Sequence, residues 1–166
     1  MLFRSRSTDV AFPSIPGVAS PRALTAAVRT ANPLIAQAGA PGTPMPYLVP
    51  QTDKDGIEKA GIRLPDIAAP LATYTGWNFR NKSIGGTDQL FPLMGSYIPF
   101  PATKEKRTEA KDPRDSIAER YPSRDIYLQV VRKISEQLVA ERYLLGEDVQ
   151  AVVKRAGDNW DLLTGK

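Results

Sequence analysis

The amino-acid sequence predicts an α+β chain in which proline-rich loops and short strands precede a C-terminal αα-hairpin. Three observations carry this prediction. All 15 prolines lie at or before Pro122, and proline fixes the backbone and removes a hydrogen-bond donor, so long helices are expected only beyond it. Residues 47–79 contain short apolar runs separated by turn residues, which is typical of strands. Residues 123–160 carry apolar side chains at helical spacing.

The composition limits the domain count and the chemistry. A chain of 166 residues has the length of one domain, which we divide into a loop and strand segment (1–122) and a helical segment (123–166). The sequence contains no histidine and no cysteine. It therefore excludes a Ser-His-Asp triad, a disulfide and a thiolate metal site within this chain. Chemistry would have to use carboxylates, Lys, Tyr or hydroxyl groups, and we expect neither a cofactor nor a metal.

The charge and hydropathy patterns argue against two classes of partner. The net charge is +4, but the four arginines among the first 50 residues are dispersed, whereas a nucleic-acid binder concentrates its cations on one face. No stretch approaches the ~20 apolar residues of a membrane helix. The first residues lack the apolar region of a secretory signal. We therefore expect neither nucleic-acid nor membrane binding, and the sequence assigns no compartment.

The first half of the chain predicts few regular elements. Ser20 and Pro21 are typical of a helix start, so a helix is expected over 20–29. Further along, 47–49 and 57–64 are expected as strands joined by a hairpin turn at 53–56, because Asp-Gly favours positive φ. A calcium loop is the competing interpretation of this turn, but isoleucine stands where a Glu ligand is needed. A third strand is expected over 71–75.

The segment from Lys104 to Asp125 is the most highly charged. Of its 22 residues, seven are positive and six negative, and such a mixture is typical of a solvated surface. Asp112 and Pro113 resemble a helix start, so a short helix is expected over 114–121.

The C-terminal segment predicts two helices that pack against each other. Ser123 is expected to cap a helix that extends to about Tyr143 and to present one apolar face, formed by Tyr127, Val130, Val131, Ile134 and Leu138. Gly146 breaks this helix, and a second one is expected from Glu147. The second helix presents Val149, Val152, Val153 and Ala156, and Trp160, Leu162 and Leu163 are expected to fold back over the hairpin.

The residues with the clearest binding chemistry follow the third predicted strand. Tyr74, Thr75, Trp77 and Asn78 surround Gly76. The aromatic rings offer apolar surface, and the hydroxyl and amide groups can orient a ligand, so these four are the candidate substrate-pocket residues. The alternative is that the rings anchor the core and Asn78 caps a turn. No catalytic residue is identified.

Two neighbouring segments are less informative. Residues 81–87 contain Lys-Ser and two glycines, but in the reverse order to a phosphate-binding loop. Residues 90–100 are strongly apolar with two internal prolines, and we expect them to be buried.

Several motifs in this order resemble one known family. They are FPSIPG at 12–17, YLVPQTDKDG at 47–56, AGIRLPDIAAPLATYTGWNFR at 60–80, GSYIPF at 95–100 and DPRDSIAERY at 112–121. Together with the helical hairpin they resemble the C-terminal portion of a bacterial family of uncharacterised α/β-hydrolase-domain proteins. TYTGWN is the most specific motif, and the resemblance covers about residues 10–160.

The resemblance implies an α/β fold in a parent protein of which this chain supplies the last part. The serine nucleophile would lie upstream, since no Gly-x-Ser-x-Gly motif is present. The chain would complete the core, and part of the pocket wall, of a hydrolase domain that acts on a small ester-like molecule. It would be inactive alone, and its partner would be the remainder of that domain. The alternative is a non-enzymatic binding or assembly module that docks a partner on its helical hairpin.

Overall fold

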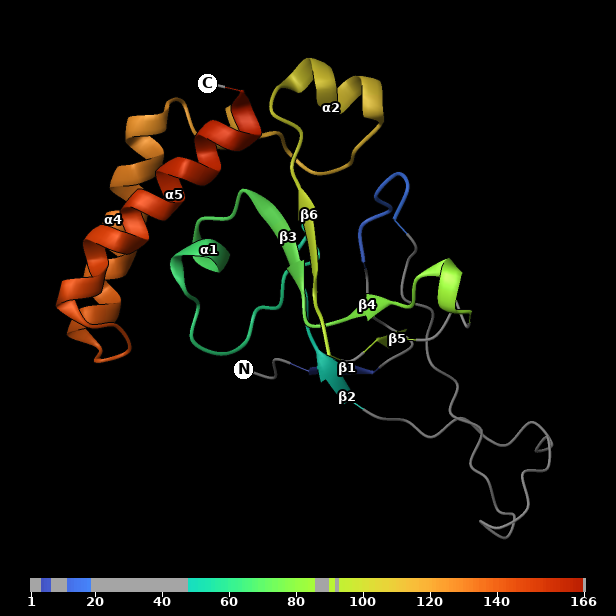
Figure 1. Ribbon diagram of the computed structural model, residues 1–166, viewed down its shortest axis with the longest axis horizontal. Helices are drawn as coiled ribbons and strands as arrows, with labels where there is room; N and C mark the ends of the chain where they lie inside the picture. Colours follow the sequence, from blue (N-terminus) through green and yellow to red (C-terminus); the bar gives the residue numbers. More distant parts are fainter. Residues whose placement is uncertain (1–3, 7–11, 19–47, 86–89, 92, 166) are drawn as a thin grey trace, which may run out of the picture.

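The computed structural model describes residues 4–6, 12–18, 48–85, 90–91 and 93–165. Within them, a long helical hairpin stands beside a group of short strands and turns (Figure 1). The predicted helix over 20–29 lies outside the described residues. The α+β character of the chain is confirmed.

The strands form three separate antiparallel pairs, each of only two strands. The pairs are β1 (Arg4–Arg6) with β2 (Leu48–Pro50), β3 (Ala72–Thr75) with β6 (Ser96–Pro99), and β4 (Asn78–Phe79) with β5 (Leu90–Phe91). A 3-10 turn, η2 (Lys82–Ile84), lies between β4 and β5. The predicted strands at 47–49 and 71–75 are thus found as β2 and β3.

The turn at 53–56 is confirmed, but the strand predicted over 57–64 is wrong. The Asp53 carboxylate accepts hydrogen bonds from the backbone N–H groups of Asp55 and Ile57, and Gly56 has a φ of +82°. Beyond the turn a single bridge, Thr52 to Glu58, joins the two sides. The chain then leads into the short helix α1 (Pro65–Ala68) instead of continuing the ladder.

The charged segment forms two short helices rather than one. α2 (Lys104–Ala110) was not predicted. α3 (Ile117–Arg120) begins three residues later than expected, because Ser116 caps it and Glu119 bonds back to the Ser116 N–H. The predicted helix start at Asp112 is wrong because Arg114 turns into the interior.

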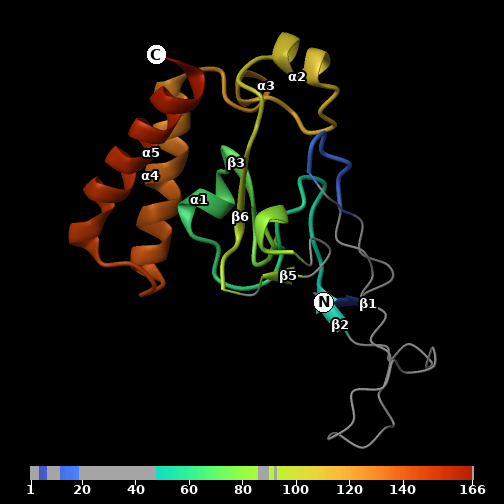
Figure 2. The same ribbon diagram turned by 45° about the vertical axis from the view of Figure 1, so that its right-hand side comes forward.

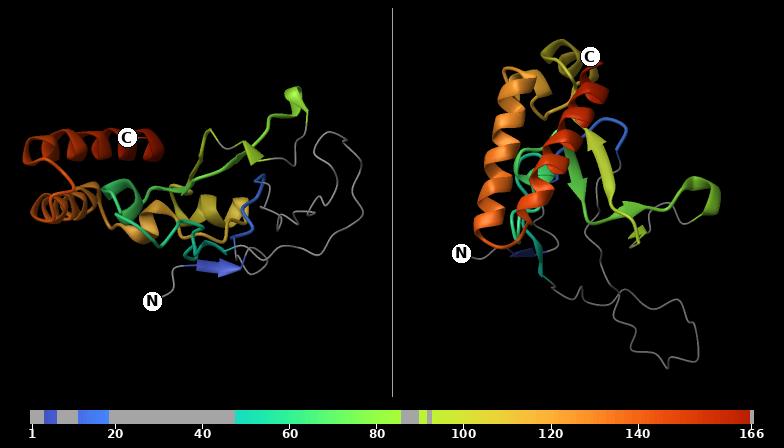
Figure 3. Two further views of the ribbon diagram at one scale, coloured as in Figure 1. Left: turned by 90° about the horizontal axis from the view of Figure 1, so that it is seen from below. Right: turned by 60° about the vertical axis from the view of Figure 1, so that its left-hand side comes forward.

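The two C-terminal helices are the longest elements and lie side by side (Figures 1 and 3). α4 (Arg124–Ala140) begins as predicted, with the Ser123 hydroxyl accepting from the Ile126 N–H. A 3-10 turn, η3 (Gly146–Asp148), leads into α5 (Val149–Thr164).

The expected fold-back of Trp160, Leu162 and Leu163 is wrong, since α5 continues through all three to Thr164 and Gly165 caps it. Trp160 stays in the helix because it lies four residues after Ala156, on the same buried face.

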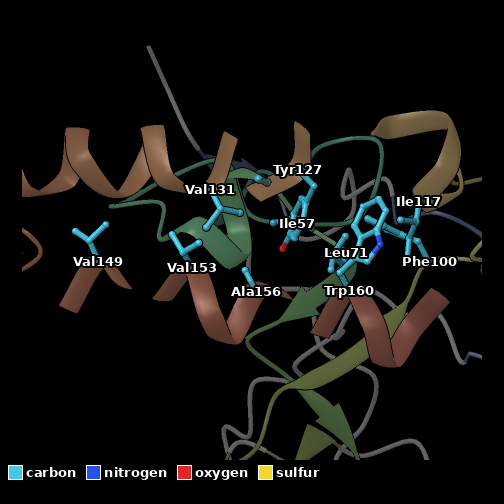
Figure 4. Packing of buried hydrophobic residues seen from close by; sticks show 11 residues of the cluster. Ile57, Leu71, Phe100, Ile117, Tyr127, Val131, Val149, Val153, Ala156 and Trp160 are labelled. Atoms are coloured by element: carbon cyan, nitrogen blue, oxygen red, sulfur yellow. The ribbon is translucent and has the colours of Figure 1, made fainter. Parts of the chain in front are cut away.

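The core lies between the hairpin, α1 and the β3–β6 pair (Figures 2 and 4). The Tyr127 ring stacks on Trp160 at a centroid distance of 5.2 Å and joins the two helices. Buried hydrophobic side chains from both halves of the chain complete this cluster: Ile57, Ala69, Leu71, Phe100, Ile117, Val131, Val149, Val153 and Ala156.

Residues 90–100 do not form the buried segment that their composition predicts. Leu93 and Met94 are 82% and 63% exposed, and the described part of the segment supplies strands β5 and β6. Phe100 alone among the described side chains of this segment belongs to the core. The burial prediction fails because two-stranded sheets leave one side of each strand uncovered.

Candidate substrate-pocket wall

The four predicted pocket residues lie along β3 and the turn that follows it. Antiparallel pairing places Tyr74 opposite Tyr97 and Thr75 opposite Ser96. Because neighbouring side chains of a strand point to opposite faces, Tyr74 and Thr75 lie on different faces of the sheet. The structure therefore divides the predicted set in two.

On one face, Tyr74 pairs with Tyr97, a residue that was not among the predicted site residues. Their ring centroids are 5.3 Å apart and the rings are tilted by 59°. Tyr74 is half-buried and Tyr97 is 48% exposed. The pair is therefore partly open to solvent.

On the other side, the hydroxyl groups of Thr75 and Ser96 hold the turn closed. The Thr75 hydroxyl donates to the Trp77 carbonyl and accepts from the Ser96 N–H, 3.0 Å away. The Ser96 hydroxyl donates to the same carbonyl at 2.9 Å. The Thr75 hydroxyl therefore stabilises the turn that follows β3.

Trp77 and Asn78 also make internal contacts. The Trp77 ring packs edge-on against Phe12 and Phe79, with centroid distances of 5.2 and 5.5 Å. The side-chain amide oxygen of Asn78 accepts a hydrogen bond from the Phe79 N–H. Trp77 thereby joins the N-terminal segment to β4, a contact that suits an anchor as well as a pocket wall.

A buried ionic network lies behind β3 and was missed by the sequence analysis. Arg114 is 2% exposed, although it belongs to the segment expected to be solvated. Its guanidinium group donates to both carboxylate oxygens of Asp112, to the Thr73 hydroxyl and to the carbonyls of Ile98 and Pro99. All five N–H donors of the side chain are used.

A second arginine continues this network. Arg120 donates to both carboxylate oxygens of Asp55 and lies with its guanidinium carbon 3.9 Å from the centre of the Phe100 ring. Burial of these charges is possible because each is paired and hydrogen-bonded. The expectation that this segment is wholly solvated is therefore wrong, and no composition signal separates these arginines from their exposed neighbours.

The tyrosines near β3 are neutral phenols at neutral pH. Burial raises the pKa of Tyr74, and the negative charge of Asp66 raises it further. Burial and Asp66 also raise the pKa of Tyr97. Tyr121 rises to a pKa of about 12 through burial. Each of these groups can donate a hydrogen bond without ionising.

A groove of about 530 Å³ lies away from these residues, along the second half of α4. Its lining includes Ile134 and buried Leu138 together with exposed Ile62 and Tyr143. None of the four predicted pocket residues lines it.

The described residues contain no group of three or more acidic side chains placed to hold a metal ion. In the same part of the chain, no helix has the length and apolar character needed to cross a membrane.

Comparison with protein families gives one match. The model of the alpha/beta hydrolase domain family matches residues 16–154. This chain belongs to the alpha/beta hydrolase domain family. No curated protein and no solved structure matches it. The family match includes β2 through α4, so both the Tyr74–Tyr97 pair and the buried arginines lie within the family domain.

Proposed function

We propose that this chain is the C-terminal segment of a hydrolase domain, where it completes the core and forms part of the pocket wall. It does not catalyse ester hydrolysis by itself. Its partner is the remainder of the domain, and the substrate of the complete domain is a small ester-like molecule.

The observation that carries the proposal is the uncovered β5–β6 region in a member of this family. Leu93, Met94 and Tyr97 are exposed, and the strands beside them pair with one neighbour each. Exposed apolar patches of this kind are typical of surfaces that contact another part of a protein. A larger hydrolase sheet would cover them.

The sequence supports the proposal that this chain does not catalyse ester hydrolysis by itself. Triad chemistry needs a base that accepts the nucleophile's proton, and the family's Gly-x-Ser-x-Gly nucleophile motif sits at a strand-to-helix turn. This sequence has no histidine and no such motif. Its tyrosine hydroxyls are held neutral, so they can orient a substrate but do not replace the imidazole base.

The alternative, a non-enzymatic module that docks a partner on its hairpin, has less support. The apolar face of α4 and α5 already packs into the chain's own core through Val131, Val153 and Trp160. A docking partner would have to use the outer faces, which are mostly polar. We therefore favour the pocket-wall role.

The decisive experiment is an ester assay on the purified chain. We expect no turnover of p-nitrophenyl acetate or butyrate above that of a mock purification. Turnover that co-elutes with the chain through two chromatographic steps, and that a serine-directed inhibitor abolishes, would overturn the proposal. The source reading frame upstream of Met1 gives an independent check, because the proposal expects it to continue and to contain Gly-x-Ser-x-Gly.

A further inference from the structure

The groove along the second half of α4 has a volume of about 530 Å³ and no role in the proposed function. Two parts of the chain form its lining. The loop before α1, together with α1 itself, contributes Gly61, Ile62, Arg63 and Ala68, and α4 with the residues that follow it contributes Ile134, Gln137, Leu138, Glu141 and Tyr143. A cavity of this size lies within the range of small-molecule sites.

The lining combines apolar surface with a pair of opposite charges. Its aliphatic side chains are those of Ile62, Ala68, Ile134 and Leu138. Arg63 is its positive residue and Glu141 its negative one. Small-molecule sites typically have this composition, in which apolar surface holds the body of the ligand and a few polar groups orient it. The groove therefore suits a small amphipathic molecule.

Arg63 has hydrogen-bonding capacity that the described chain does not use. Its Nη2 donates to the Ile67 carbonyl at 2.8 Å, whereas a carboxylate oxygen of Asp53 lies 3.8 Å from the same nitrogen, beyond hydrogen-bond distance. Its Nε is buried and has no hydrogen-bond partner among the described residues. A buried donor of a charged group is costly to leave without a partner. The side chain as a whole is 35% exposed and lines the groove, so an acceptor in the groove can approach it.

Glu141 is in a different state, because it is exposed and has a partner. Its Oε1 accepts a hydrogen bond of 2.8 Å from the Gln137 side-chain amide. Glu141 therefore needs no ligand to satisfy its charge, but its charge acts on any ligand that enters. A carboxylate is attracted by Arg63 and repelled by Glu141. The two charges thus favour one orientation for a molecule that carries a single carboxylate.

We propose that this groove binds an aliphatic monocarboxylate. The carboxylate accepts hydrogen bonds from Arg63, whose planar guanidinium group matches it in shape, and the aliphatic chain packs on Ile134 and Leu138. Because the Arg63 Nε is shielded from water, the guanidinium group turns toward the ligand as the carboxylate binds. The inference goes beyond the proposed function, since none of the four candidate pocket-wall residues lines the groove.

The ligand chemistry is tested with hexanoate, 1-hexanol and adipate, which share their chain length and differ in their end groups. Each is titrated into the full chain, and NMR follows the methyl signals of Ile134 and Leu138 and the ring signals of Tyr143. We expect saturable shifts with hexanoate. Hexanol, which lacks the charge, and adipate, whose second carboxylate meets Glu141, should each bind at least about fivefold more weakly. Absence of saturable hexanoate binding, or equal binding of the three probes, would overturn the inference.

Variants assign the binding to the groove. Arg63→Gln is expected to weaken hexanoate binding to the level of hexanol and to leave hexanol binding unchanged. Glu141→Gln is expected to bring adipate binding close to that of hexanoate, and this variant decides by itself if circular dichroism shows that Arg63→Gln does not fold. Arg155→Gln is the matched control, because this exposed arginine pairs with Asp66 and does not line the groove. Equal loss of hexanoate binding in Arg63→Gln and Arg155→Gln, or unchanged adipate binding in Glu141→Gln, would contradict the inference.

Discussion

Arg120 holds Asp55 through two hydrogen bonds, of 2.7 and 2.8 Å, although 65 residues separate them in the sequence. The pair fastens the 53–56 turn to α3 across the face of Phe100. Both side chains are largely buried. Each buried charge is therefore stabilised by the other.

Removing one member of this pair should destabilise the fold strongly. We expect Asp55→Ala to lower the free energy of unfolding by about 3–5 kcal/mol, since it leaves Arg120 buried without its counter-ion. Urea denaturation at neutral pH measures the change. Asp158→Ala, which breaks the exposed pair with Lys154, is the control and should have little effect. Equal effects at the two sites would show that the buried pair has no special role.

Gly95, rather than Gly76, is the glycine that the turn beside the pocket residues requires. A Cβ at Gly95 would lie 2.2 Å from the Thr75 carbonyl oxygen, whereas one at Gly76 would meet only the Glu58 side chain at 3.6 Å. We therefore expect Gly95→Ala to cost about 1–3 kcal/mol through a forced backbone shift.

Gly76→Ala should be nearly neutral, because its backbone is not left-handed and its surroundings are open. Thermal unfolding of the two variants compares them directly. A larger loss for Gly76→Ala would contradict the close approach of Gly95 to the Thr75 carbonyl at the end of β3.

The two tryptophans should respond differently to truncation. Trp160 is 5% exposed and stacked on Tyr127, so Trp160→Ala should cost about 3–5 kcal/mol. Trp77 is half-buried, and we expect Trp77→Ala to cost about 1–2 kcal/mol. Chemical denaturation followed by circular dichroism measures both. If the two substitutions lowered the free energy of unfolding by similar amounts, Trp77 would have to be as fully packed as Trp160.

Replacement of Trp160 by phenylalanine gives a finer test. The Trp160 indole N–H is buried and has no partner among the described residues. Trp160→Phe keeps the aromatic packing and removes an unsatisfied donor, so it should cost less than half as much as Trp160→Ala. A larger cost would indicate that this N–H has an acceptor.

Stability should fall in acid through the carboxylates of the charged segment. Hydrogen bonds from the Ser116 backbone and hydroxyl, and then from Arg107, lower the pKa of Glu119 to about 2. A hydrogen bond from Lys54 lowers the pKa of Asp115. Because the folded-state pKa values lie below the unfolded ones, this stability is present above about pH 4.5 and is lost as pH falls toward 2.

The measurement is the urea midpoint across this acid range. Glu119→Gln keeps the geometry of the capping box but removes the titrating group. We expect its midpoint to fall less steeply below about pH 4.5 than that of the unmodified chain. Parallel curves would exclude Glu119 as a contributor.

How far the sequence alone predicts the candidate site depends on how local each contact is. Tyr74 was identified because it belongs to an unusual aromatic run beside a strand. Tyr97 carries no such signal, since it lies on another strand and meets Tyr74 only after β3 has paired with β6. The register between two strands determines which side chains lie opposite each other, and the sequence of one strand does not specify that register.

The sequence by itself determined the elements whose hydrogen bonds close within a few residues. The Ser123 cap and the apolar spacing of α4, the Asp53 turn and the strand at Ala72–Thr75 are of this kind. The tertiary structure decided which charged and apolar side chains are buried. Arg114 is interior because Asp112, Thr73 and two strand carbonyls satisfy its donors, while Leu93 is exposed because nothing in the described chain covers it. Burial depends on partners that are distant in sequence, and composition does not reveal them.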